Sequence, residues 1–316
     1  MAQKILIVGL PGSMGTLTAE RMLNSDGEYS TTGFGIGADS DNGKIITIKS
    51  GELLQDYLIF SFSKLTEWEL GIIKEEQPII IDFTHKDIIK SNWENYYKKW
   101  GCPLIVGTIG MKKEDFVGNT APVIIGSPNL CPQIVEILRF FTELKPKSLK
   151  KWKFEIIESH QEGKTEPSGT GVRVKECLEK AGATEKTPMV SIRDKKEQLE
   201  MGVPKEYLNG HGWHTYEFFI KKNKYPLHDP SNFLRKITGD LCVHTYFTNK
   251  DFKEFWWENP SKTLILLICT KGSSVKLIHN VNGRQPYIDG LFKTVLPTMR
   301  HLINVGENSV LDMFDL

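Results

Sequence analysis

Residues 5–15, ILIVGLPGSMG, decide the fold: an apolar run of strand length ends at a glycine, and a helical pattern begins just after the loop. A phosphate can approach the backbone amides of such a loop because no β-carbon stands in the way. The N-terminus of the next helix attracts the same anion. A purely structural turn is the alternative interpretation. The strand-loop-helix context favours a dinucleotide site and predicts these cofactor-binding residues: Gly9, Gly12, Ser13, Met14 and Gly15.

The sequence on either side of this loop alternates between short apolar runs and helical patterns. Strands are expected at 4–8, 78–82, 103–106 and 122–125, and helices at 16–23, 86–100 and 134–141. Buried strands separated by helices predict an α/β fold, a Rossmann-type parallel sheet with helices on both faces.

The pattern changes after about residue 150, where strand signals dominate. Strands are expected at 153–157, 189–192, 215–220, 241–247, 264–270 and 275–279, with one helix at 172–180. This pattern predicts a second, α+β mixed-sheet domain. The tail, 290–302 and 309–314, is expected to be helical and to pack back onto the first domain. We therefore predict a dinucleotide-binding domain from 1–128 with 286–316, and a substrate-binding and oligomerisation domain at 129–285. Residues 221–262 form an insertion, interpreted as decoration or as an oligomer contact or lid.

Composition excludes several classes of protein. The 316 residues carry 40 Lys and Arg against 39 Asp and Glu, a net charge of +1, so nothing favours nucleic acid or a membrane surface as partner. No apolar run approaches the roughly 20 residues of a membrane helix. The five cysteines are at least 27 residues apart, which fits neither a disulfide framework nor a zinc site. His211 and His214 lack a third ligand at a convincing spacing, so we expect no metal site.

Residues 154–171, FEIIESHQEGKTEPSGTG, carry the strongest chemical signal. A strand ends at His160, which can donate a proton near neutral pH. Lys164 supplies a compact positive charge. Ser168 or Thr170, with glycine amides at a helix N-terminus, can hold a carboxylate. A capped helix beside a solvated loop is the alternative. The whole segment favours a small anionic substrate that is protonated at one atom.

Three further positions have two interpretations each. Asp39 favours the ribose hydroxyl of NAD and Lys44 the 2′-phosphate of NADP, so NADPH and NADH both stay open. Arg284 can clamp a carboxylate or form a structural ion pair. Asp82 either lies at the ligand-binding edge of the sheet or caps the next helix.

Seven segments together resemble one family, 4-hydroxy-tetrahydrodipicolinate reductase, also called dihydrodipicolinate reductase, and in particular its plant-type branch. They are GLPGSMG (9–15), IDFT (81–84), GTIG (107–110), GSPNLCPQIV (126–135), ESHQEGKTEPSGTG (158–171), SIRDKKEQLEMGVPKEYLNGHGWH (191–214) and HNVNGRQPYIDG (279–290).

The resemblance implies a function and roles for the site residues. Members use NADPH or NADH to reduce 4-hydroxy-tetrahydrodipicolinate to tetrahydrodipicolinate in lysine and diaminopimelate biosynthesis. The residue matching His160 is a catalytic acid or polarising group, and the one matching Lys164 binds substrate and is a candidate proton source. Ser168, Gly169 and Thr170 match a carboxylate clamp, with Arg284 as a further substrate-binding candidate. Phe83, Thr84, Gly107 and Thr108 match the cofactor site.

The resemblance also implies a small dicarboxylate substrate and a homo-oligomer, a dimer or tetramer. The expected location is the cytoplasm, or the plastid stroma if a transit peptide is missing from this chain.

The chain departs from the family pattern at four places. Ile109 stands for a threonine, Pro132 adds neither charge nor amide donor, Ser13 replaces a basic residue, and the 221–262 insertion is foreign to the family. Two rival functions follow: a reductase of the same fold acting on another cyclic imine, and a nucleotide-binding sensor without turnover.

Overall fold

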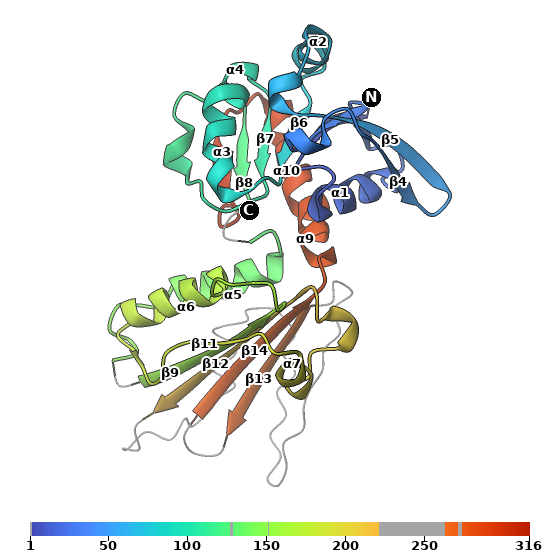
Figure 1. The fold of residues 1–316 in the computed structure, drawn as a ribbon. Coiled ribbons are helices and arrows are strands. Elements are labelled where there is room, and N and C mark those ends of the chain that lie inside the picture. Colours follow the sequence, from blue (N-terminus) through green and yellow to red (C-terminus); the bar gives the residue numbers. More distant parts are fainter. Residues whose placement is uncertain (1, 127–128, 151, 221–262, 271–273) are drawn as a thin grey trace. The chain divides into compact units, whose positions relative to one another are not determined.

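The computed structural model describes residues 2–126, 129–150, 152–220, 263–270 and 274–316. The predicted insertion at 221–262, with its expected strand at 241–247, lies outside the described residues. The chain forms two compact units (Figure 1): unit 1 is Met1–Val135 with Tyr287–Leu316, and unit 2 is Glu136–Pro286. None of the described helices is long and apolar enough to cross a membrane.

Unit 1 is built on a sheet in which the strand order is β15-β8-β7-β6-β1-β3-β5-β4, with β2 beside β1. All pairs are parallel except the β4–β5 hairpin. Its strands are β1 (Gln3–Val8), β2 (Tyr29–Thr31), β3 (Phe34–Ile36), β4 (Ile45–Ser50), β5 (Leu53–Phe60), β6 (Ile79–Asp82), β7 (Leu104–Val106), β8 (Val123–Ile125) and β15 (Val310–Asp312).

Helices cover both faces of this sheet. They are α1 (Ser13–Leu23), α2 (Glu67–Glu76), α3 (Lys86–Asn92), α4 (Lys98–Trp100), α9 (Gln285–Gly290, which begins at the unit boundary) and α10 (Leu296–Val305), with π-helical segments η3 (Trp93–Tyr97) and η6 (Leu291–Val295). Short 3-10 turns lie at Asp39–Asp41, Phe62–Lys64 and Lys113–Phe116.

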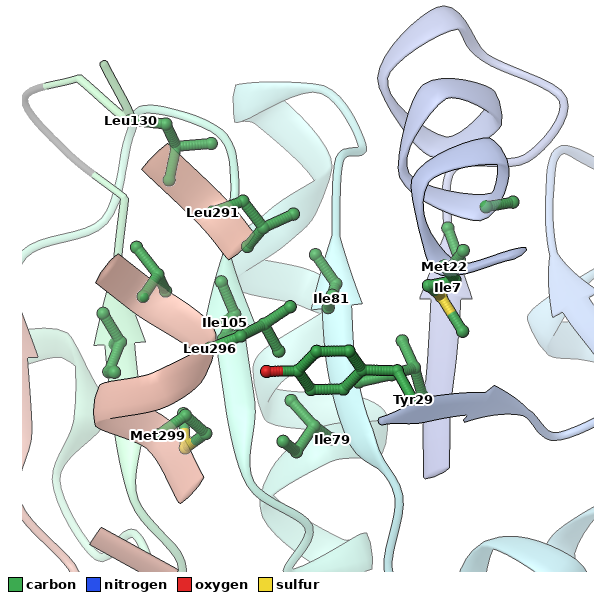
Figure 2. Packing of buried hydrophobic residues seen from close by; sticks show 14 of the residues in the cluster. Ile7, Met22, Tyr29, Ile79, Ile81, Ile105, Leu130, Leu291, Leu296 and Met299 are labelled. Carbon is green, nitrogen blue, oxygen red and sulfur yellow. The ribbon is translucent and has the colours of Figure 1, made fainter. Parts of the chain in front are cut away.

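Alternate side chains of each central strand enter opposite cores, because strand side chains alternate between faces. Ile79 and Ile81 of β6 pack with the C-terminal helices, as Figure 2 shows, whereas Ile80 packs on the other face with α3. All three side chains are fully buried. Burial on both faces explains why these strands are continuously apolar. The predicted α/β fold, a Rossmann-type parallel sheet with helices on both faces, is confirmed.

Two details of unit 1 differ from the sequence-based expectations. Residues 309–314 were expected to be helical, but Val310–Asp312 forms β15, which pairs in parallel with β8 at the sheet edge. This expectation was wrong because a three-residue strand is fixed by its distant partner rather than by local pattern. The predicted helix at 86–100 is interrupted by the π-helical segment Trp93–Tyr97.

Unit 2 contains a mixed sheet in the order β10-β9-β12-β14-β13, with β11 beside β9. Its strands are β9 (Trp152–His160), β10 (Thr184–Glu185), β11 (Val190–Ile192), β12 (His211–Ile220), β13 (Thr263–Thr270) and β14 (Ser274–Asn282). Its helices are α5 (Pro132–Thr142, which begins at the unit boundary), α6 (Gly169–Lys180) and α7 (Lys195–Glu200), with a 3-10 turn at Lys205–Tyr207. Figure 1 shows α5 and α6 along one face of the sheet.

Two buried histidines on adjacent strands of unit 2 lie face to face. The rings of His214 on β12 and His279 on β14 stack with centroids 4.5 Å apart. Burial lowers the pKa of His279 to about 3, and it lowers the pKa of His214 well below its usual value. Within the described residues, the Nδ1 atom of each ring has no hydrogen-bond partner. Both rings are therefore neutral at physiological pH.

Acid is expected to destabilise the protein through these histidines. In the unfolded chain, the imidazole of His279 binds a proton below about pH 6.5, whereas in the folded chain it stays neutral down to about pH 3. Protonation therefore favours the unfolded state, and the free energy of unfolding falls as the pH falls between these two values. Within that window, His279 removes about 1.4 kcal/mol of stability per pH unit. Urea unfolding at pH 7.5 and 5.5 measures the loss.

The variant His279→Gln should lose less stability over this pH interval than the parent chain. His301→Gln is the control, because His301 is exposed on α10. Equal losses in all three proteins would contradict the account.

Candidate functional site

The start of α1, directly after the glycine-rich loop, has three backbone donors without a partner among the described residues. Gly12 is the N-cap of α1 without a side-chain cap, and no acidic residue stands in the first turn. The amides of Ser13, Met14 and Gly15 have no partner within the described residues. A β-carbon on Gly12 would lie 2.6 Å from the carbonyl oxygen of Gly9. The loop therefore requires glycine and presents a helix N-terminus suited to a phosphate.

Three loops converge at the carboxyl edge of the parallel strands in unit 1. Phe83, which follows β6, lies against glycines that follow β1 and β7. A β-carbon on Gly9 would be 3.2 Å from the Phe83 carbonyl carbon, and one on Gly107 would be 2.4 Å from the Phe83 ring. The sheet thus brings Gly9, Phe83 and Gly107 together, at the edge where open α/β sheets bind ligands.

The neighbouring threonines differ in their contacts. The Thr84 amide donates to Asp82 Oδ1 at 2.6 Å, and its hydroxyl accepts from Asn92 at 3.3 Å. Thr108 is half-buried after β7 and Ile109 is 53% exposed.

Asp82 is not the cap of α3, because the N-cap is His85, whose side chain accepts from the Asp87 amide.

The segment after β3 adjoins the glycine-rich loop, since a β-carbon on Gly37 would lie 2.3 Å from the Leu10 carbonyl oxygen. Strand β3 has only three residues, and no strand was expected at its position from the sequence. Lys44 donates to Asp41 at 2.7 Å, and Asp39 accepts from Ser63 at 3.2 Å. The charge of Lys44 is therefore already paired.

In unit 2, the end of β9 places a histidine beside a buried carboxylate. Oε2 of Glu158 lies 2.6 Å from Nδ1 of His160, and the Glu158 side chain is 0% exposed. Burial alone would raise the pKa of Glu158, but hydrogen bonds from His160, Arg193 and Ser191 hold it at about 2. Glu158 is therefore an acceptor, so Nδ1 of His160 carries a hydrogen and donates it. The Nε2 atom of His160 has no partner among the described residues and is the atom available to a ligand.

Arg193, the residue after β11, holds the Glu158–His160 pair in place, because β11 lies beside β9 in the sheet. Its guanidinium binds Glu158 with two nitrogens, Nη2 to Oε1 at 2.7 Å and Nη1 to Oε2 at 3.1 Å. It also donates to the carbonyl oxygens of Lys164 at 2.8 Å and Glu166 at 3.2 Å. One side chain thus fixes both the partner of His160 and the loop that carries Lys164.

Neither Glu158 nor Arg193 was among the predicted site residues. Both lie inside segments that carry the family resemblance, and the available signal was a charged residue at the end of each of two strands. Gln198 of α7 adds a third contact, donating to the carbonyl oxygen of His160 at 2.7 Å. Glu158, Arg193 and Gln198 thus fix the position of His160.

The loop after His160 offers a cation and free amides. The half-buried Lys164 ammonium has no ion pair or hydrogen bond within the described part of the chain. The amides of Gly169 and Thr170, the first two residues of α6, have no partner in the part of the chain that the structure describes. Ser168 is the N-cap of α6, but its buried hydroxyl lies 2.6 Å from Nε2 of His214 and accepts from the Gly171 amide at 3.3 Å. The amides, more than the Ser168 hydroxyl, are open to an anion.

Arg284 follows β14 at the end of the sheet where β9 ends, because Gly212 of β12 pairs with both His160 and Val281. Its side chain is exposed and makes no ion pair with the described residues. The structural ion pair considered from the sequence is therefore not formed there.

No group of three or more metal-binding side chains occurs among the described residues. His211 lies 2.8 Å from the Ser159 hydroxyl through Nε2 and 3.1 Å from the Tyr207 carbonyl through Nδ1. Both of its ring nitrogens are thus occupied by the protein.

Comparison with known proteins gives a consistent relationship. Residues 3–118 match the family described as dihydrodipicolinate reductase, N-terminus. A rice protein named probable 4-hydroxy-tetrahydrodipicolinate reductase 2, chloroplastic, is 32% identical over 221 residues, which cover 67% of this chain and 66% of the rice protein. The Arabidopsis thaliana protein named 4-hydroxy-tetrahydrodipicolinate reductase 2, chloroplastic, is 25% identical over 324 residues, covering 99% and 76%. The chain thus spans about two thirds of the rice relative.

Solved structures show the same fold. A dipicolinate-bound dihydrodipicolinate reductase from Paenisporosarcina sp. TG-14 has a TM-score of 0.54 and 14% identity, covering 100% of both chains. Aspartate semialdehyde dehydrogenase II from Vibrio cholerae also reaches 0.54, at 9% identity, covering 96% of this chain and 99% of its own. The structural likeness supports the fold, and the sequence matches identify the chain as a member of the dihydrodipicolinate reductase family.

Proposed function

We propose that the chain reduces 4-hydroxy-tetrahydrodipicolinate to tetrahydrodipicolinate with NADPH or NADH, in lysine and diaminopimelate biosynthesis. The observation that carries this proposal is the site at the end of β9. There a buried carboxylate holds Nδ1 of His160, while Nε2 of His160 and the ammonium of Lys164, four residues later, have no partner among the described residues. Family membership supports the reaction.

Unit 1 is the proposed dinucleotide-binding domain, and its residues fit that group. The amides at the start of α1 have no partner among the residues described, and they suit the pyrophosphate because the helix dipole adds positive potential there. Phe83, Thr84, Gly107 and Thr108 would lie by the nicotinamide. When bound, the reduced nicotinamide supplies a hydride to an unsaturated carbon of the substrate ring.

Unit 2 is the proposed substrate-binding domain, whose residues handle the substrate's charges. The amides of Gly169 and Thr170 would bind one carboxylate at the start of α6, with Lys164 as its counter-ion. Ser168 would help to form this carboxylate site indirectly, because as the N-cap of α6 it accepts from the Gly171 amide and so fixes the first turn of the helix. Arg284 would bind the second carboxylate, since its guanidinium has no acidic partner within the described residues.

His160 is the proposed proton donor. Hydride addition places electron density on the ring nitrogen, and this density must be quenched by a proton. Glu158 accepts from Nδ1, which would direct Nε2 of the protonated imidazole to the substrate. The overall reaction consumes one hydride and one proton and releases water, so atoms and charge balance.

The oligomer and the compartment are also proposals. We propose that unit 2 mediates a homo-oligomer, as the family resemblance implies. The names of the rice and Arabidopsis relatives support the plastid stroma as an alternative to the cytoplasm.

Replacing His160 with Gln should lower turnover by about 100-fold or more, since the proton donor is lost. Cofactor affinity should change little. The measurement is absorbance at the nicotinamide band, with NADPH and then NADH, and with substrate generated from pyruvate and aspartate semialdehyde by the preceding enzyme. Unchanged turnover would remove His160 from the mechanism. If the parent chain binds the cofactor but does not oxidise it, the result would favour one of two other functions: a reductase of another cyclic imine, or a nucleotide-binding sensor without turnover. The exposed Ile109 would then be the first residue to replace.

A methyl group on Gly12 should weaken dinucleotide binding by about tenfold or more, because a β-carbon there would lie 2.6 Å from the Gly9 carbonyl oxygen and distort the loop. Calorimetric titration of Gly12→Ala with each cofactor measures the effect. Gly71→Ala is the matched control, since nothing lies within 4 Å of its added β-carbon. Equal affinity in both variants would argue against the phosphate loop.

Replacing Arg193 with Met should cost about 3–5 kcal/mol of stability, because it leaves the Glu158 carboxylate buried without its cation. Adding Glu158→Gln should recover part of this loss without recovering turnover. Urea unfolding and the absorbance assay separate the two effects. Arg173→Met, which breaks an exposed ion pair with Glu176, is the control and should cost less than about 1 kcal/mol. A double variant with restored turnover would show that the buried charge pair has no role in catalysis.

A further inference from the structure

The carboxylate of Asp82 is buried at the end of β6 and is bound by neutral donors. Its side chain is 0% exposed. Oδ1 accepts from the Thr84 amide at 2.6 Å, and Oδ2 accepts from Asn92 at 3.1 Å and from the Tyr97 hydroxyl at 2.5 Å. No Lys, Arg or His forms an ion pair with it among the described residues. A buried charge without a cation depends on all of its hydrogen bonds.

The main chain around Asp82 connects the three loops of the cofactor edge. Its carbonyl oxygen accepts from the Gly107 amide at 2.8 Å, and the next amide, that of Phe83, donates to Val8 at 2.9 Å. Asn92 also donates to the Thr84 hydroxyl oxygen at 3.3 Å. The position of Asp82 therefore determines where Phe83 and Thr84 lie.

The π-helical segment explains how Asn92 and Tyr97 reach the same oxygen. In an α-helix, residues five apart lie about 140° from each other around the axis, because each residue turns about 100°. The wider turn over Trp93–Tyr97 reduces this separation. Both side chains consequently meet Oδ2 of Asp82. Such single π-turns inside helices are frequent at functional sites.

Tyr97 is suited to a structural role rather than to proton transfer. It is 1% exposed, and burial followed by the charge of Asp82 raises its pKa well above the usual value. Its ring lies 5.7 Å from that of Trp100 and 5.9 Å from that of Phe62. The hydroxyl therefore stays protonated and donates to Asp82.

We propose that Tyr97 and Asn92 are positioning residues for the nicotinamide end of the cofactor, acting through Asp82 on Thr84. The inference rests on the proposed dinucleotide function. Because the Thr84 oxygen already accepts from Asn92, its own hydrogen is directed to another acceptor. The primary carboxamide of a nicotinamide offers such an acceptor in its oxygen. The rest of the dinucleotide is held by the glycine-rich loop, which these residues do not touch.

The test compares nucleotides that differ only in the nicotinamide. Calorimetric titration uses NADH and NADPH, and ADP-ribose and its 2′-phosphate as fragments that lack the ring. Tyr97→Phe should weaken both reduced dinucleotides by about tenfold, the loss expected for one hydrogen bond to a charged group, and the fragments by less than about twofold. Tyr96→Phe is the matched control, since Tyr96 stacks on Phe62 at 4.3 Å and does not contact Asp82. It should bind all four like the parent chain.

Asn92→Ala is the second variant, in case Tyr97→Phe fails to fold. It removes the donor to both Asp82 and Thr84 and should show the same selective loss. Equal weakening of dinucleotides and fragments, or no weakening, would overturn the positioning role while leaving the dinucleotide site intact. Failure of the parent chain to bind any of the four nucleotides would instead overturn the proposed function, and this inference with it.

Discussion

A carboxylate without access to water, that of Glu158, sets the arrangement of the substrate site. A buried charge is costly unless it is paired and fully hydrogen-bonded. The pairing needs Arg193, and Arg193 reaches Glu158 because β11 runs beside β9 with Ser191 opposite Glu158. The remaining donors of the same guanidinium then hold the loop that carries Lys164. Satisfying one charge therefore places the histidine and the main chain of the loop at Lys164 and Glu166.

Unit 1 uses a second buried carboxylate, that of Asp82, in a different way. Glu158 is met by an imidazole and a guanidinium, and it lies where a proton is proposed to move. Asp82 is met by an amide, a carboxamide and a phenol, which do not change charge near neutral pH. The first environment orients the His160 ring through its Nδ1 hydrogen. The environment of Asp82 fixes the position of the loop that carries Phe83 and Thr84. The partners of each carboxylate thus match its proposed task.

The features of the molecule that follow from local sequence pattern were predictable. The buried strands of unit 1 are continuously apolar because both faces are covered, and the glycine-rich loop needs glycine for reasons visible in eleven residues. Strands β3 and β15 were not predictable, since each has three residues and depends on distant partners. Arg193 lies 35 residues from Glu158, and Tyr97 reaches Asp82 only through a π-turn. Such contacts depend on tertiary structure, which hydrophobic periodicity does not encode.

Hydride transfer to the substrate ring can be followed directly by isotope labelling. The enzyme would be given reduced cofactor that carries deuterium at the transferable position, with substrate generated in place, and the product would be analysed by mass spectrometry. The product should contain one deuterium from the cofactor, and the His160→Gln variant should form this product about 100-fold or more slowly. A parent chain that binds the cofactor but leaves the label on the nucleotide would contradict hydride transfer to the substrate.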